Sequence, residues 1–214
     1  MENDTNEASP NSTRTPVSTE KIDMDLHGDI ILILEQVELR VSSKVLSLAS
    51  PVFKALCTPG FAEGNTIAMG GVSCIHLPED DTDAMIAFCS VTHFRPYSND
   101  APITLLENLA IITDKYDCVS SMRSFGGLSL SDSIRKASGT LNDGRLLYSA
   151  YVFDNAYAFQ QVTVLIVYSL SGAQQASYGI SAEIRALLPE GVLGEYPSRH
   201  FFCRSVELIV IDIL

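Results

Sequence analysis

The sequence is short of basic residues and has no long apolar run. Its 214 residues include 14 Lys and Arg against 26 Asp and Glu, a formal net charge of −12. Binding a phosphate backbone requires a stripe of cations, so this deficit argues against nucleic acid and favours a protein or peptide partner. No apolar run approaches the ~18 residues of a membrane span. The opening segment MENDTNEASPNSTRTPVSTEKIDMD also lacks the basic and apolar regions of a signal peptide. We therefore expect an intracellular protein, cytoplasmic or nuclear, without membrane contact.

Motifs for nucleotides, metals and catalysis are missing as well. "FGGLSLSDS" has two glycines but no phosphate-binding pattern. The four histidines, His27, His76, His93 and His200, have no nucleophile or carboxylate at a recognisable motif spacing. The acidic run "PEDDTD" lacks the spacing of a calcium loop, and is better explained as a capped, solvated helix start. We expect no catalytic residue, no metal and no cofactor. A small hydrolase-like enzyme is the least favoured alternative.

Cysteine is present but irregular. Cys57, Cys74, Cys89, Cys118 and Cys203 are widely spaced, odd in number and mostly set within apolar runs. This pattern is typical of reduced thiols that serve as small core residues, and it does not favour a metal or redox site. With 46% hydrophobic and 19% charged residues, the chain as a whole should be globular.

The N-terminal half predicts alternating strands and short helices. Residues 1–24 are polar and should form a disordered tail. Ile30 to Leu34 reads as a buried strand, and Val37 to Val41 alternates apolar and polar residues, so the two predict a hairpin. Val72 to Leu77 predicts a third strand. Between them, the Gly- and Pro-punctuated stretch 57–71 should be a loop.

The stretch RVSSKVLSLASPVFKAL, residues 40–56, has helical periodicity around a Ser-Pro step. Proline inside a helix costs ~3 kcal/mol, because its nitrogen has no hydrogen and its ring clashes with the preceding turn. Serine is a good N-cap, however, and proline is favourable at the first helical position. We therefore expect two short helices meeting at Ser50, both facing one core.

Helices are predicted over most of the remaining chain. One of about three turns should follow "PEDDTD", with Met85, Phe88, Cys89 and Thr92 on one side. Another should start near Thr104, with Glu107 completing a capping box, and run to about Asp117. "GRLLYSAYVFDNAYAFQQVTVLIVYSL" favours one or two buried helices, the alternative being a strand at Val162 to Tyr168. "SAEIRALLPEG" predicts a short helix, and "VELIVIDIL" is β-like.

This order of elements resembles the BTB/POZ domain, in the version common among fungal proteins. The resemblance covers residues 26–122 and is carried by four motifs: GDIILIL, LRVSSKVLSLASPVFKAL, IHLPEDDTDAMIAF and LLENLAIITDKYDC. It implies an α+β fold, with a helical cluster flanked by a small mixed sheet and a C-terminal, mainly helical extension. It also implies a non-catalytic protein-interaction module that acts by homodimerisation or by binding another protein.

Two features bear on the mode of binding that the resemblance implies. In the zinc-finger branch of the family, an acid at the position of Asp29 pairs with a basic residue, which here is replaced by Ser43. This argues against that branch's corepressor-binding mode. Phe61-Ala62-Glu63 is similar to the element by which BTB adaptors contact a cullin ubiquitin-ligase scaffold; alternatively, Phe61 folds back on the core. The candidate binding residues are therefore Phe61, Glu63 and Asp29.

The expected organisation is a disordered tail over 1–24, the BTB/POZ domain over 25–122, a helical extension over 128–200 and an uncertain tail over 201–214. Whether residues 128–214 form a second domain or complete the first core stays open at this point.

Overall fold

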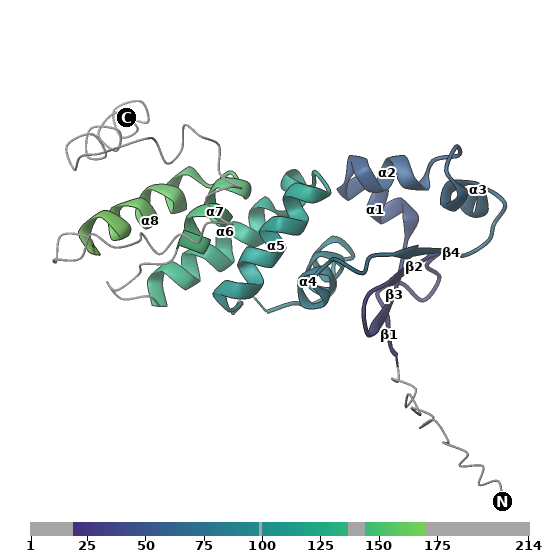
Figure 1. Ribbon diagram of the computed structural model, residues 1–214, viewed down its shortest axis with the longest axis horizontal. Coiled ribbons are helices and arrows are strands. Elements are labelled where there is room, and N and C mark those ends of the chain that lie inside the picture. Colours follow the sequence, from purple (N-terminus) through teal and green to yellow (C-terminus); the bar gives the residue numbers. More distant parts are fainter. Residues whose placement is uncertain (1–18, 99, 137–143, 170–214) are drawn as a thin grey trace, which may run out of the picture.

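A computed structural model describes residues 19–98, 100–136 and 144–169. These residues form four strands and eight helices, a mixed α+β fold (Figure 1). The strands are β1 (Glu20–Asp23), β2 (Ile30–Ile33), β3 (Val37–Val41) and β4 (Ser73–His76). The helices are α1 (Ser43–Ala49), α2 (Pro51–Cys57), α3 (Ala62–Ala68), α4 (Thr82–Thr92), α5 (Ile103–Lys115), α6 (Val119–Lys136), α7 (Gly144–Val152) and α8 (Ala156–Ser169).

The sheet is small and mixed, with the strand order β1-β3-β2-β4. β2 and β3 form the predicted antiparallel hairpin, with Leu32 opposite Leu39, and β4 pairs parallel to β2. β1 pairs parallel to β3. The prediction of a disordered tail through residue 24 is therefore wrong for residues 20–23. These residues form an edge strand that the sequence does not reveal, because they include few apolar side chains. Residues 1–18 lie outside the described part.

One face of the sheet is buried. In β2, β3 and β4 the side chains alternate between buried and more exposed positions, as expected for strands with a single core-facing side. α4 packs against β3 and α1 on that side. In Figure 1 the sheet and α1–α4 occupy one end of an elongated molecule, and α5–α8 continue toward the other end.

The kink between α1 and α2 forms as predicted. Ser50 has extended backbone angles, its Oγ accepts a hydrogen bond from the Phe53 N–H at 3.1 Å, and Pro51 starts α2. The same hydroxyl donates to the carbonyl of Tyr116 at 2.5 Å. One buried side chain thus caps α2 and ties it to the end of α5. Only part of the apolar face expected for these helices is buried, since Phe53 is enclosed while Leu48 and Val52 are exposed. Leu46, which lies outside that expected face, is also fully buried.

The segment predicted as a loop over 57–71 contains a helix, α3. Gly64, which suggests a break in the sequence, is a buried packing position: a Cβ placed there would lie 2.1 Å from the Thr58 carbonyl oxygen. Glycine therefore allows the first turn of α3 to approach the end of α2 closely. The prediction failed because a glycine that permits a close contact looks the same in sequence as one that ends an element.

The acidic run before α4 forms the predicted helix start. Asp81 is the N-cap, and its carboxylate accepts a hydrogen bond from the Ala84 N–H at 2.9 Å. Asp80 has a second role that the sequence did not show. Its carboxylate accepts from Lys115 Nζ at 2.7 Å and from the Tyr116 hydroxyl at 2.5 Å, which joins this loop to the end of α5.

The N-cap of α5 lies two residues before the predicted Thr104, and the predicted capping box is wrong. Its N-cap is Pro102, which makes no side-chain capping bond, so Thr104 and Glu107 lie inside the helix. Of the four residues expected on its apolar face, Leu109, Ile112 and Tyr116 are buried and Leu105 is half-buried. The Tyr116 ring stacks on Phe53 of α2, with centroids 4.4 Å apart.

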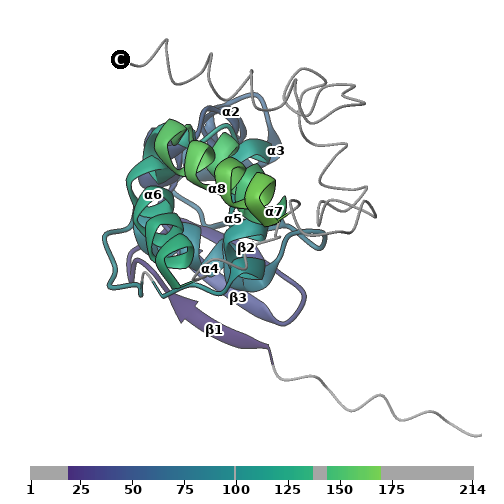
Figure 2. The same ribbon diagram turned by 90° about the vertical axis from the view of Figure 1, so that its left-hand side faces the viewer.

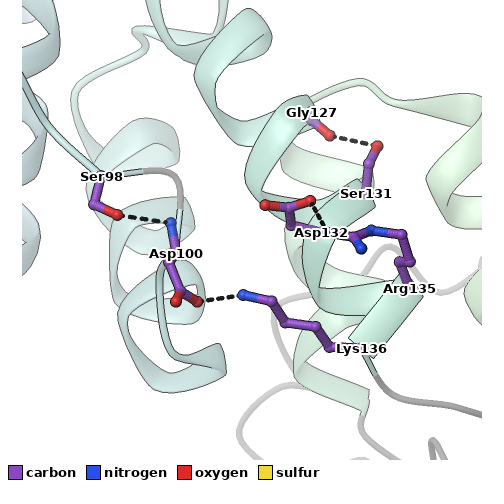
Figure 3. A network of polar contacts seen from close by, with 7 residues as sticks. All are labelled: Ser98, Asp100, Gly127, Ser131, Asp132, Arg135 and Lys136. Atoms are coloured by element: carbon purple, nitrogen blue, oxygen red, sulfur yellow. Dashed lines mark hydrogen bonds and ion pairs between the residues drawn. The ribbon is translucent and has the colours of Figure 1, made fainter.

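Helices α6, α7 and α8 pack against one another beyond α5 (Figure 2). α6 passes through Gly126-Gly127 without a break and spans the predicted boundary region at 122–128. Figure 3 shows how its last turn is held: Lys136 pairs with Asp100 in the connection between α4 and α5, and Arg135 pairs with Asp132 at 2.9 Å. The helical interpretation of the segment after residue 143 is confirmed by α7 and α8. The predictions for "SAEIRALLPEG" and "VELIVIDIL" lie outside the described residues.

Candidate functional site

A shallow depression of about 460 Å³ lies on the surface formed by α1 and α2. Its walls are the side chains of Ser43, Lys44, Ser47, Leu48, Lys54 and Cys57. Leu48 stands out because 88% of its surface is exposed, although it occupies the apolar periodicity of the helix. The kink at Ser50 turns α2 relative to α1, and so the outer positions of both helices line one hollow.

Asp29 lies beside this depression and is already bonded. Its two carboxylate oxygens accept hydrogen bonds from the Ser43 N–H and the Ser43 hydroxyl, both at 2.7 Å. Ser42, the N-cap residue of α1, makes no side-chain capping bond. Asp29 therefore caps α1 from outside the helix. Ser43, the residue that the sequence comparison singled out opposite Asp29, is thus its hydrogen-bond partner in place of a cation.

Phe61 and Glu63 lie together at the start of α3. Phe61 is the N-cap residue and 54% of its surface is exposed, while Glu63 is half-buried in the first turn. A carboxylate in the first turn is favourable with the helix dipole, which accounts for Glu63 without any partner. Phe61 has no such local explanation. The alternative that Phe61 folds back on the core is wrong.

Large apolar side chains are exposed repeatedly along the segment from α1 to β4. They are Leu48, Val52, Phe61, Met69 and Val72. α1, α2 and α3 lie at the same end of the molecule (Figure 1), and α2 packs against both neighbours. Single exposed apolar residues are ordinary on protein surfaces, but a gathering of them at one end is typical of a contact surface.

Both ring nitrogens of His93 are hydrogen-bonded to backbone groups. His93 Nε2 accepts a hydrogen bond from the Ser42 N–H at 3.1 Å, and Nδ1 lies 2.9 Å from the Cys89 carbonyl oxygen. This arrangement requires the neutral ring with its proton on Nδ1. Burial lowers the pKa of His93, although the hydrogen bond to Cys89 and the charge of Asp25 oppose the shift and Arg95 adds to it. His27 and His76 are exposed, and His200 lies outside the described residues.

The cysteine prediction holds for two of the described positions. Cys89 and Cys118 are buried, and burial raises the pKa of both thiols, that of Cys118 to about 12. Cys57 is half-buried and Cys74 is exposed, so these two are not core residues; Cys203 is outside the range described. Within residues 19–98, 100–136 and 144–169, no group of three or more His, Cys, Asp or Glu side chains is placed to hold a metal ion.

Over the same stretches of chain, no helix has the length and apolarity needed to cross a bilayer. Comparison with known protein families finds no match to this chain, and comparison with curated proteins finds none either. The choice of function therefore depends on the motifs, the element order and the surface described above.

Proposed function

We propose that the chain is a non-catalytic protein-interaction module of the BTB/POZ type, which binds a second copy of itself or another protein through the end formed by α1, α2 and α3. The observation that carries the proposal is the exposure of Leu48 beside the α1–α2 depression, on a helix whose other apolar positions are partly or fully buried. A leucine left in water gives up the ~1.5–3 kcal/mol that burying it would contribute, and contact with another protein recovers that free energy.

The order of elements supports the family part of the proposal. A hairpin, two short helices meeting at Ser-Pro, a parallel strand and two longer helices follow one another as the motifs imply. β1 and α3 are additions to that expected order. The histidine with the most contacts bonds only backbone groups and a neighbouring threonine, which gives the hydrolase-like alternative no support.

Site-specific photo-crosslinking on the full chain in cells tests this proposal. A benzophenone amino acid would replace Leu48 or Phe61, and, as a matched control, Phe94, which is 94% exposed at the end of α4. We expect discrete crosslinked species from positions 48 and 61, and none from position 94. An absence of crosslinks at 48 and 61, or equal crosslinking at all three positions, contradicts the proposal.

A second candidate function is that of an adaptor that binds a cullin ubiquitin-ligase scaffold. The exposed ring of Phe61, next to the Glu63 carboxylate, favours it, since an apolar anchor beside a charge is a common form of binding hot spot. Phe61→Ala and Glu63→Ala should each abolish binding of purified cullin while the circular-dichroism spectrum stays unchanged, and Phe94→Ala should not affect binding. Scaffold binding that survives both changes rejects this contact.

A further inference from the structure

Almost every basic side chain in the described part of the chain has a partner within the protein. Each of the following forms an ion pair or donates to a backbone carbonyl: Lys21, Arg40, Arg95, Lys115, Arg123, Arg135, Lys136 and Arg145. In a chain with a net charge of −12, carboxylates are abundant and such pairing is expected. Of the Lys and Arg side chains in the described residues, only Lys44 and Lys54 have neither an ion pair nor a hydrogen bond to a backbone carbonyl there.

Both exceptions line the same hollow, the α1–α2 depression. Lys44 comes from the first turn of α1 and Lys54 from the last turn of α2, with the exposed Leu48 on the same wall. The position of Lys54 near the C-terminus of α2 favours a cation there. That preference does not explain Lys44, which lies at the opposite, positive end of its own helix.

The other groups around the depression do not neutralise the two lysines by direct contact. Asp29, which lies beside the depression, accepts two hydrogen bonds from Ser43. Desolvation raises the pKa of the Cys57 thiol, with a further rise from Asp29 and a lowering from Ser47, so this wall residue stays uncharged at neutral pH. Within the described part of the chain, the hollow thus presents two cations without an ion-pair partner beside an apolar side chain.

We propose that the α1–α2 depression binds an acidic peptide segment of a partner protein, with carboxylates against Lys44 and Lys54 and an apolar side chain against Leu48. This inference rests on the proposed interaction function and specifies its partner chemistry. Nucleic acid fits less well, because two cations on a chain of net charge −12 cannot neutralise a phosphate backbone. Charge complementarity of this kind selects the partner and speeds its association.

Fluorescence anisotropy with defined probes tests the inference on the full chain. The probe is a short labelled peptide of alternating glutamate and leucine, compared with the same peptide carrying glutamine in place of each glutamate and with labelled single-stranded DNA. We expect saturable, salt-sensitive binding of the acidic peptide only. The double variant Lys44→Gln/Lys54→Gln should weaken it about tenfold, as the loss of two surface ion pairs implies. Lys44→Arg/Lys54→Arg should retain binding.

The matched control is Lys21→Gln, because Lys21 already pairs with Glu38 in the sheet. It should leave affinity unchanged. Thiol labelling then locates the site: the bound peptide should slow modification of Cys57, which lines the depression, and leave that of the exposed Cys74 unaltered. Equal effects of the Lys21 and Lys44/Lys54 changes, protection of Cys74 alone, or tighter binding of DNA than of the peptide would overturn the assignment.

The two proposals fail in distinguishable ways. If the acidic peptide does not bind but position 48 still crosslinks to a protein in cells, the interaction module stands and the acidic partner is wrong. If position 48 gives no crosslink and the peptide does not bind, both proposals are wrong.

Discussion

Single residues at the kink between α1 and α2 have effects that extend beyond their own helix. The Ser50 hydroxyl satisfies the Phe53 N–H and the Tyr116 carbonyl together, and the side chain is almost fully buried. A buried polar group that loses its partner costs about as much free energy as a strong hydrogen bond gains. The structural importance of this serine therefore exceeds that of an ordinary N-cap.

Ser50→Ala should lower the free energy of unfolding by about 1–3 kcal/mol, because it leaves both backbone groups without a partner. Ser42→Ala is the matched control, since the Ser42 side chain makes no capping bond at the start of α1. It should change stability by less than about 0.5 kcal/mol. Urea unfolding of both variants measures the difference, and equal effects of the two changes would show that the Ser50 contacts are unimportant.

His93 should make stability depend on pH. Its folded-state pKa is lowered below the ordinary value of 6.5, chiefly by burial, so the unfolded chain binds a proton more readily than the folded one. The free energy of unfolding should therefore fall as the pH drops through 6.5 toward the lowered folded value, and the contribution should be constant above that window. A protonated ring would also direct Nε2–H at the Ser42 N–H.

Urea unfolding at a series of pH values between 7.5 and 5.5 checks this, with His93→Gln as the comparison. The variant should lose most of the pH dependence in that window, since a glutamine side chain can donate and accept without titrating. An unchanged slope in the variant would show that the pH dependence does not come from His93.

At the scale of elements, regular patterns were predictable and exceptions to local rules were not. β2, β3, α1 and α2 follow from alternating or helical periodicity together with the Ser-Pro step. β1 was missed because its pairing partner, β3, is distant in the chain, and a polar edge strand has no apolar signature.

The candidate surface was predictable only in part. The residue types at Phe61 and Glu63 are visible in the sequence, but the exposure of Phe61 depends on how α3 packs. The role of Asp29 depends on the distance from Ser43 across the sheet-to-helix turn. Within the described residues, the lack of an ion pair at Lys44 and Lys54 depends on where the fold places the carboxylates, and no local pattern encodes it.

The two glycines in the middle of α6 give a test at this scale. A Cβ at position 126 would lie 2.4 Å from the nearest ring atom of Phe153, which is fully buried, whereas at position 127 the nearest atom is the side-chain nitrogen of Asn155 at 3.0 Å. Both changes to alanine gain about 1 kcal/mol of helix propensity. Gly126→Ala should nevertheless destabilise by about 1–3 kcal/mol through overpacking.

Gly127→Ala, measured by the same thermal or urea unfolding, should be close to neutral because the Asn155 side chain has only to yield by a few tenths of an ångström. The comparison keeps the helix and the type of substitution the same and changes only the neighbours that the new methyl group meets. Equal stability of the two variants would mean that Phe153 relaxes at no cost.

At the scale of the whole molecule, the described helices share one continuous apolar interior. The buried cluster runs from Met24, beside the sheet, to Val162 in α8. α5 packs against α4 on one side and against α7 on the other. Residues 144–169 therefore complete the same core as the earlier helices.

This arrangement predicts that a fragment ending at residue 125 is unstable. The cut would fall inside α6 and would remove α7, whose Leu146, Leu147 and Tyr148 are buried. We expect residues 19–169 to unfold in one cooperative urea transition, and residues 19–125 to bind a hydrophobic dye and unfold broadly or at much lower urea. Equal unfolding free energies for the two fragments would show that the first half folds independently.

The two hydrogen bonds of the Ser50 hydroxyl also bear on how tightly a partner can be bound. Because these bonds fix the angle between α1 and α2 before a partner arrives, binding does not have to order a flexible kink and loses less conformational entropy. Removing the Ser50 hydroxyl should then raise the dissociation constant for the partner, even though Ser50 is buried and does not contact the partner.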